Sequence, residues 1–312
     1  MDNERPIIFP DYELLNASGG KQDSIARERT MYDGTKKTVN FMQGHGGERG
    51  AGIWDTNDRE DWSGVFNHMC MDLHMGMYIA ERLQEALKNP SVRRKLHQKK
   101  KSEYIEIIDA PDFLQNVANA SWIHDWGKRC DEEDRALEEG ERKDKHHIAG
   151  FRIAKRIGRT NKRVAKIAKV AITHHFYKGD RAGYKLDLYD KIAILADEMA
   201  GQEYVKLKDR FADLRYRWIT KRKAEGLPPL INEDQFNAHE RTTHEIAKEI
   251  FEILDTNEDE FLDSIPPERE EIRFLRGIRE RGEEDEGIVV VRRVQQGRSM
   301  TREELMEIVS QS

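Results

Sequence analysis

The sequence predicts an all-α fold, because its apolar residues recur with helical periodicity along most of the chain. The clearest apolar stripe consists of Val164, Ile167, Ala168, Ala171 and His175. These positions fall on one face of a helix with 3.6 residues per turn. A second stripe runs from Tyr189 to Met199, and only one short stretch, 288–294, reads as a strand. Helices joined by polar connections indicate a helical bundle.

The individual helices are expected in order along the chain. They are predicted at about 62–89, 112–126, 146–157, 164–179 and 189–200. The first begins at Trp62 and stops at Pro90, since proline cannot continue a helix. Beyond these, the pattern stays largely helical as far as Leu254, with an interruption at 226–230. A final helix is expected from the capping box Thr301–Glu304.

Three parts are expected in the domain organisation. Residues 1–60 lack periodic apolar residues and are rich in Gly, Asp and Asn, which predicts an irregular N-terminal arm. The helical core covers 61–201, with a basic insertion at about 89–111. Residues 202–312 are expected to form a helical C-terminal extension whose tail loosens from about 277. We therefore expect the chemistry-bearing residues of the core to be held by helices.

Composition narrows the class of protein. The 53 basic and 59 acidic residues give a formal net charge of -6, which argues against a surface devoted to nucleic acid. Cys70 and Cys130 cannot build a disulfide framework, which favours a reducing compartment. The first residues lack the pattern of a signal peptide, and no stretch reaches the ~20 apolar residues that span a bilayer. We expect a cytoplasmic protein without a membrane partner; self-association is left open.

Histidines and aspartates recur at intervals within the predicted helical core. They are His68, His124, Asp125, His146, His147, His174, His175 and Asp197. Asp197 lies on a predominantly apolar helix, where a carboxylate is costly unless it is paired or binds a metal ion. Imidazole and carboxylate ligands together suit Mn, Fe or Zn. The pattern therefore predicts a divalent-metal site.

In this order the motifs resemble the HD superfamily of metal-dependent phosphohydrolases. The matching segments are ASWIHDWGK (120–128), HHIAGFRIAKRIG (146–158), VAITHHFYKG (170–179) and DKIAILADEMAG (190–201). The order H, HD, H, HH, D covers about residues 62–201. The resemblance implies an HD-domain helical bundle with additional C-terminal helices, and a phosphohydrolase activity.

The resemblance also implies a role for each candidate residue. His68, His124, Asp125 and Asp197 match the ligands of a first metal ion. Asp125, His146, His174 and His175 match those of a second, with Asp125 bridging the two. The doublet of histidines favours the two-metal form, with Mn or Fe expected and Mg, Ni or Zn as alternatives. Two ions can share and activate a hydroxide and clamp a phosphate for in-line attack.

Cationic residues near these motifs are expected to meet the substrate. Lys128 matches a lysine that contacts substrate phosphate, and it would offset charge on the phosphate oxygens. We therefore assign Lys128 and Asp125 to catalysis. Lys178 and Arg181 are further expected to bind substrate. The basic run 93–101 is either a solvated face or a rim that draws in polyphosphate.

Two ligand assignments keep alternatives. His68 lies twelve residues before Ala80, which is the spacing that the resemblance asks for, with Gly76 as the small residue at the eighth position; His74 is its competitor. The two histidines differ by about 120° in direction on a helix, so both would not bind one ion. Likewise His146 has the expected spacing and His147 is the fallback.

The expected function is metal-dependent hydrolysis of a phosphoester or phosphoanhydride bond in a nucleotide-type substrate or another phosphorylated small molecule. Partial resemblance extends to diadenosine-tetraphosphate hydrolases and to HD-GYP phosphodiesterases. The specific HD-GYP activity is not expected, because Phe176 and Lys185 depart from that motif. Two alternatives remain. One is a signalling module that binds a nucleotide through a degraded HD site. The other is a metal-dependent nuclease that uses 93–101 and 210–223 to bind nucleic acid.

Overall fold

The protein is predominantly helical in the computed structural model, which confirms the predicted all-α fold. The structure describes residues 6–17, 24–30, 36–42, 53–56, 64–125, 142–174, 185–200, 204–281, 284–296, 304–305 and 307. Among these residues, no helix combines the length and the apolar character that a bilayer crossing requires.

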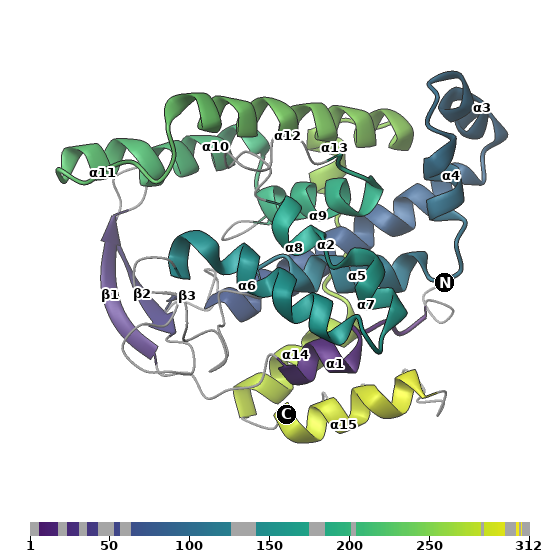
Figure 1. Cartoon of the computed structure of the whole chain (residues 1–312), viewed down its shortest axis with the longest axis horizontal. Coiled ribbons are helices and arrows are strands. Elements are labelled where there is room, and N and C mark those ends of the chain that lie inside the picture. The colour runs from purple at the N-terminus through teal and green to yellow at the C-terminus, as the bar shows by residue number, and fades with distance from the viewer. Residues whose placement is uncertain are drawn as a thin grey trace.

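Three helices form the centre of the bundle. They are α2 (Gly64–Leu87), α5 (Phe113–Ile123) and α9 (Leu188–Met199), and each packs against the other two (Figure 1). Each contributes fully buried side chains to the core, among them Leu73, Trp122 and Leu195. Burying one such apolar side chain stabilises a fold by roughly 1.5–3 kcal/mol. The polar residues carried by these helices are therefore held within the buried core.

Further helices cover this centre on opposite sides in Figure 1. Above it lie α10 (Leu207–Arg215), α11 (Lys221–Ala224), α12 (Glu233–Leu254) and α13 (Glu258–Asp263). Packed against α5 and α9 or against one another are α6 (Arg142–Ile157), α7 (Lys162–Ile167) and α8 (Val170–Thr173). Below lie α1 (Tyr12–Ala17), α14 (Glu270–Arg281) and α15 (Glu284–Gln295).

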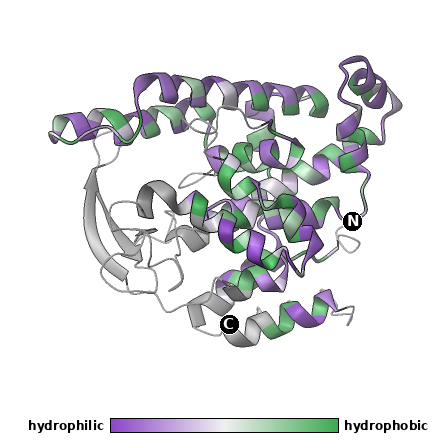
Figure 2. Cartoon of the chain, in the orientation of Figure 1, coloured by the Kyte–Doolittle hydropathy of each residue, from purple (hydrophilic) through white to green (hydrophobic). Residues whose placement is uncertain are grey.

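The insertion predicted at about 89–111 folds into two short helices, α3 (Pro90–Gln98) and α4 (Ser102–Ile108). Asn89 caps α3, because its side-chain oxygen accepts a hydrogen bond from the Ser91 amide at 2.9 Å. The segment is mostly hydrophilic, as its purple colour in Figure 2 shows. Leu96 and Ile108 are nevertheless buried, so a few apolar side chains anchor it to the bundle.

A small antiparallel sheet differs from the irregular arm expected for residues 1–60. Its strands are β1 (Ser24–Thr30), β2 (Lys36–Met42) and β3 (Ile53–Thr56), in the order β1-β2-β3 beside α2 (Figure 1). In the register, Ile25 pairs with Phe41, and Phe41 pairs with Trp54. The strands are short, and β1 is mostly polar and charged. Short runs of this kind give a weak periodic signal, so the sequence analysis did not recognise them as strands.

Two predicted elements differ from the structure. The stretch 288–294, predicted as a strand, lies in α15, where Val291 is buried. A short apolar run is compatible with either type of element, and here packing beside α1 selects the helix: the Gln295 side-chain oxygen accepts a hydrogen bond from the Tyr12 amide at 2.9 Å. The helix predicted at about 164–179 is divided into α7 and α8 as far as the structure describes it.

Gly76 lets α2 and α5 approach each other closely. A Cβ atom at this position would overlap the hydroxyl oxygen of Ser121 and would lie 3.5 Å from Cγ1 of Val117. The sequence resemblance asked for a small residue here, and the contact supplies the reason. The close approach fixes the distance between the polar residues of α2 and those that follow α5.

We expect Gly76→Ala to destabilise the protein by about 1–3 kcal/mol, because overpacking forces the two helices apart. Ser121→Ala should cost less, since it removes only the hydroxyl that the new methyl group would meet. In the double variant, the loss should be smaller than the sum of the two single losses. Denaturant unfolding of all four proteins measures this coupling, and strictly additive losses would contradict the close contact.

Candidate metal centre

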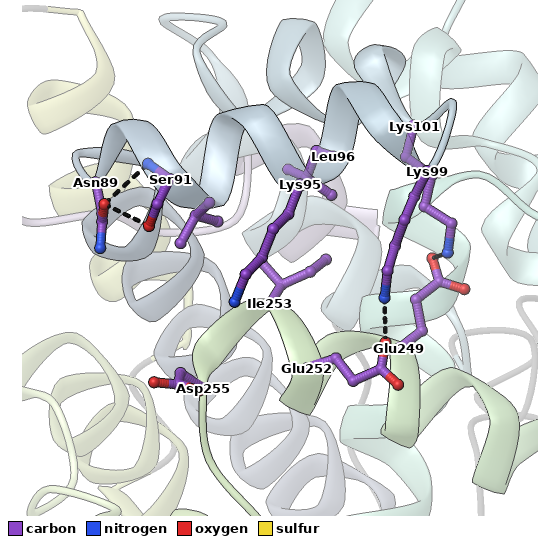
Figure 3. A pocket seen from close by; sticks show the side chains of 11 residues that line it. Asn89, Ser91, Lys95, Leu96, Lys99, Lys101, Glu249, Glu252, Ile253 and Asp255 are labelled. Carbon is purple, nitrogen blue, oxygen red and sulfur yellow. Dashed lines mark hydrogen bonds and ion pairs between the residues drawn. The ribbon is translucent and has the colours of Figure 1, made fainter.

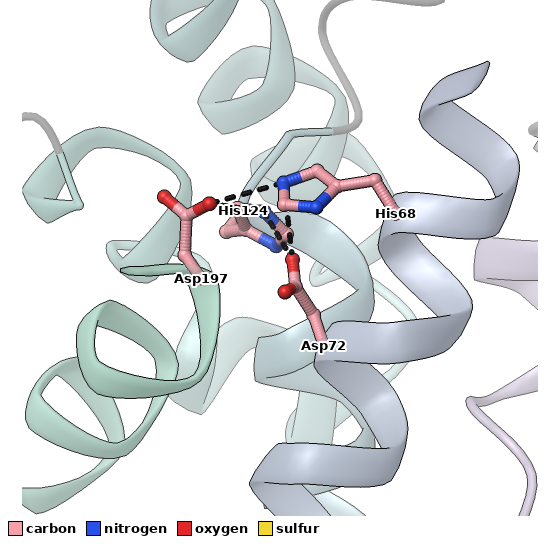
Figure 4. A group of neighbouring side chains, drawn as sticks. All are labelled: His68, Asp72, His124 and Asp197. Carbon is pink, nitrogen blue, oxygen red and sulfur yellow. Dashed lines mark ion pairs between the residues drawn. The ribbon is translucent and has the colours of Figure 1, made fainter. Parts of the chain in front are cut away.

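Four buried or nearly buried polar side chains from three segments meet at the centre of the bundle (Figure 4). His68 and Asp72 lie one turn apart on α2, His124 follows α5, and Asp197 lies in the last turn of α9. One ligand atom from each of these residues lies within 4.8 Å of those from the other three. We call these four residues the His–Asp cluster. Its donor set is one that divalent transition metals use.

Short contacts join the members of the His–Asp cluster. Nε2 of His68 lies 3.0 Å from Oδ1 of Asp197 and 3.4 Å from Oδ2 of Asp72. Nε2 of His124 lies 2.8 Å from the same Oδ2 atom of Asp72. The two imidazoles therefore point their Nε2 atoms into the space that the carboxylates share.

The other ring nitrogen of each histidine is fixed by the backbone. Nδ1 of His68 donates to the carbonyl oxygen of Ala200 at 2.9 Å, and Nδ1 of His124 donates to that of Ser121 at 2.7 Å. A carbonyl oxygen can only accept, so Nδ1 carries the proton in both rings. In a neutral ring Nε2 then presents its lone pair to the cluster. This backbone support is typical of histidines that bind metal ions.

Asp72 is the member of the cluster whose burial most needs an explanation. It is fully buried, and its Oδ1 atom has no hydrogen-bond partner among the described residues. Leaving a buried polar group without a partner costs about 1–3 kcal/mol, and more for a charged group. A bound cation would remove this cost, which makes Asp72 a candidate ligand.

The pKa values of the cluster show how its carboxylates and imidazoles influence one another. Burial alone would lower the pKa of His124, but Asp72, Asp125 and Asp197 outweigh it and raise the pKa to about 10. Burial raises the pKa of Asp72, and the two nearby imidazoles offset this only in part. Burial alone would raise the pKa of Asp197, but the neighbouring imidazoles of His68 and His124 outweigh it and lower the pKa far below its usual range. The carboxylates around His124 thus favour a positive charge at this position.

Asp125 lies between the His–Asp cluster and a further histidine. Its Oδ2 atom is 3.5 Å from Nε2 of His68 and 3.8 Å from Nε2 of His124. Its Oδ1 atom is 3.7 Å from Nε2 of His174, whose Nδ1 donates to the Val170 carbonyl oxygen at 3.2 Å. The two carboxylate oxygens thus face two different sets of imidazoles. The bridging role that the sequence analysis gave to Asp125 stays a prediction.

The remaining predicted site residues are described in part or not at all. His146 lies on α6, but the placement of its side chain is outside the described residues, whereas His147 on the same helix is buried. His175, Lys128, Lys178 and Arg181 also lie outside the described residues. Of the second predicted ligand set, the structure therefore brings together Asp125 and His174.

The structure separates His68 from its competitor His74. The imidazole of His74 is buried elsewhere, and its Nε2 atom hydrogen-bonds the carbonyl oxygen of Pro266 at 3.1 Å. Of these two histidines, only His68 belongs to the His–Asp cluster.

Asp72 is the member that the sequence analysis missed, although the sequence carried a signal for it. It lies four residues after His68, on the same face of an apolar helix, where a carboxylate needs the same explanation as Asp197.

A pocket away from the cluster tests the interpretation of the basic run 93–101. It lies between α3 and the end of α12, and lysines and carboxylates line it together (Figure 3). Nζ of Lys99 lies 2.5 Å from Glu252, and Nζ of Lys101 lies 2.8 Å from Glu249. Arg93 pairs with Asp109 at 2.7 Å. Three of the six cations of the run are thus paired within the protein, which lowers the positive charge available to a polyphosphate.

Comparisons of the chain with protein-family models, curated proteins and solved structures gave no significant match. The resemblance to the HD superfamily therefore stays a prediction based on the motifs. The arrangement of the His–Asp cluster is an independent observation, since it comes from the packing of the helices.

We expect Mn²⁺ to bind the His–Asp cluster and to raise the melting temperature, because a ligand that binds only the folded state stabilises it. His68→Ala should lower the Mn²⁺ affinity by more than tenfold. His74→Gln is the matched control on the same helix, and it should leave the affinity within about twofold even if stability falls. Isothermal titration calorimetry measures both. Equal losses in the two variants would contradict the assignment of His68.

A separate prediction concerns Glu249, which accepts hydrogen bonds from Tyr104 and Lys191 and pairs with Lys101. Burial would raise the pKa of Glu249, but these hydrogen bonds outweigh it and lower the pKa. A folded-state pKa below the unfolded value adds stability above the unfolded pKa, and this stability is lost as the pH falls through the folded pKa. Glu249→Gln should therefore cost about 1–2 kcal/mol at pH 7.

Unfolding curves between pH 7 and pH 3 test this sign. The difference in the free energy of unfolding between the wild type and Glu249→Gln should stay level down to about pH 5 and shrink below about pH 4. Glu252→Gln is the control. Glu252 pairs with Lys99 and is more exposed than Glu249, so this variant should show a smaller effect. A difference that grows as the pH falls would contradict the lowered pKa.

Proposed function

We propose that this chain is a metal-dependent phosphohydrolase that cleaves a phosphoester or phosphoanhydride bond of a nucleotide-type substrate. The observation that supports this most is the His–Asp cluster. In it, two imidazoles fixed through Nδ1 point Nε2 at carboxylates within 4.8 Å. The sequence motifs add the substrate class, because their order resembles that of the HD superfamily.

The residues of the cluster would hold a divalent ion through two imidazole nitrogens and carboxylate oxygens. A bound ion of this kind lowers the pKa of a coordinated water and polarises a phosphoryl oxygen. Asp125 lies beside the cluster and also faces His174, so a second ion would have these two residues as ligands. We propose Mn or Fe as the metal, and two ions per site.

The contributions of the protein itself are orientation and burial. The ligands come from packed helices, so little rearrangement is needed when the ion binds. Asp72 and His124 are fully buried, and a low-dielectric setting strengthens their interaction with charge at the site. The carbonyl oxygens of Ala200 and Ser121 hold the imidazole rings in one tautomer.

The two alternative functions gain no support from the described residues. A degraded site would be expected to lack ligands, whereas the His–Asp cluster offers four. For the nuclease, the basic side chains of 210–223 would need to face nucleic acid. Arg215 pairs with Glu233 at 2.6 Å, and Arg217 pairs with Asp213 at 2.6 Å. These ion pairs leave fewer cations for phosphates of a strand.

The test is a hydrolysis panel with Mn²⁺ or Fe²⁺. It includes nucleoside mono-, di- and triphosphates, diadenosine polyphosphates, cyclic dinucleotides and single-stranded oligonucleotides. At least one small nucleotide should be hydrolysed, and excess chelator should abolish the activity. Asp125→Asn should lower kcat by about a hundredfold or more, because it removes a charge beside the metal. His74→Gln is the control and should retain most of the activity.

A protein that binds Mn²⁺ but hydrolyses no member of the panel would contradict the proposed enzyme and favour the binding module. Cleavage confined to oligonucleotides would instead favour the nuclease.

A further inference from the structure

The site formed by the His–Asp cluster and Asp125 is more accessible on one side than on the others. The side chains of Asp72, His124 and Asp125 are at most 2% exposed, whereas that of Asp197 is 16% exposed. A molecule that reaches the cluster from solvent therefore meets Asp197 before it meets the other two carboxylates. Whatever lies beside Asp197 is placed to contact that molecule.

Arg210 of α10 lies at this accessible side. Its Nη2 atom is 3.8 Å from Oδ1 of Asp197, and its side chain is 14% exposed. Within the described ranges, it is the only lysine or arginine that forms an ion pair with a member of the cluster. A distance of 3.8 Å is too long for a hydrogen bond, so the N–H groups of Nη2 do not form hydrogen bonds with Asp197.

The guanidinium group of Arg210 is held by a chain of buried contacts. Nε of Arg210 donates to Oε2 of Glu198 at 3.0 Å, and Oε1 of Glu198 lies 2.9 Å from Nε2 of His239. The His239 ring stacks on Trp218 with an interplanar angle of 14° and meets the edge of Phe211. These contacts limit the rotamers of Arg210 and cut the entropy lost when it binds a ligand.

A π-helical turn completes this support. Trp218 lies in η4 (Tyr216–Thr220), which follows directly on the helix of Arg210. Turns of this type are uncommon and occur frequently at functional sites. Here the turn carries the aromatic ring that stacks on His239.

The geometry suits an anion. Arginine has five N–H donors, and its planar fork matches two oxygens of a phosphate or carboxylate. One of these donors, the Nε–H group, is used by Glu198. A phosphate that also contacts a cation in the cluster would need a fixed positive group near Asp197, because three carboxylates surround the site.

We infer that Arg210 binds the non-bridging oxygens of the substrate phosphate at this site. The inference rests on the proposed function and adds to it a residue that recognises the phosphoryl group. Arg210 acts through direct contact with the anion, and Glu198 is a positioning residue that orients the guanidinium. The rival role is purely structural, in which Arg210 only orients Asp197 as a metal ligand.

Isothermal titration calorimetry separates the two roles with Mn²⁺ and inorganic phosphate as probes. Each protein is first titrated with Mn²⁺, and the Mn²⁺-loaded protein is then titrated with phosphate. In Arg210→Gln, phosphate affinity should fall at least tenfold while Mn²⁺ affinity stays within about twofold of the wild type. Arg210→Lys, which keeps the charge but loses the fork, should show a smaller loss of about threefold or more. In hydrolysis, Arg210→Gln should raise KM.

Arg215→Gln is the matched control, because Arg215 lies on the same helix but pairs with Glu233 instead. It should leave both affinities unchanged. Circular dichroism checks that each variant folds, and Arg210→Lys takes over the test if Arg210→Gln does not.

Three results would overturn the inference. Phosphate affinity could be unchanged in the Arg210 variants, or Mn²⁺ affinity could fall as much as phosphate affinity, or the Mn²⁺-loaded wild type could bind no phosphate. Failure of the wild type to bind Mn²⁺ at all would instead remove the metal site of the proposed function, so the two failures are distinguishable.

Discussion

The structure depends on the unfavourable burial of polar and charged side chains at its centre. Three carboxylates and two imidazoles gather where the central helices pack together. Burying ionised groups is unfavourable unless they are paired or bind a cation. Asp72 and Asp125 are almost completely enclosed, and together with Asp197 they raise the pKa of His124. A sequence selected only for stability would place apolar residues here. A cation bound in the cluster would offset this cost.

These polar and charged side chains come from separate segments of the bundle. His68 and Asp72 come from α2, His124 and Asp125 follow α5, and Asp197 comes from α9. These three helices pack on one another, and Gly76 allows the closest approach between the first two. From a fourth helix, α10, Arg210 brings a positive charge to the accessible side. Support comes from backbone carbonyls and buried neighbours, so the site is built into the core.

The sequence predicted what depends on local patterns. Periodicity predicted the helical class and the helices around α2, α5, α6 and α9. Motif order predicted the candidate residues His68, His124 and Asp197. Three features depended on pairing or packing between elements and did not follow. Strands β1 and β2 pair with each other and β3 pairs with β2, and the 288–294 run becomes helical through packing beside α1. Arg210 meets Asp197 only in the folded protein.

X-ray diffraction from crystals soaked in Mn²⁺, with data collected at an energy where manganese scatters anomalously, tests the central claim most directly. The account predicts an anomalous peak about 2.0–2.3 Å from Nε2 of His68, Nε2 of His124 and a carboxylate oxygen of Asp197. It also predicts that the proton on Nε2 of His124 gives way to the ion. Manganese bound only at surface carboxylates, with His124 still paired to Asp72, would contradict it.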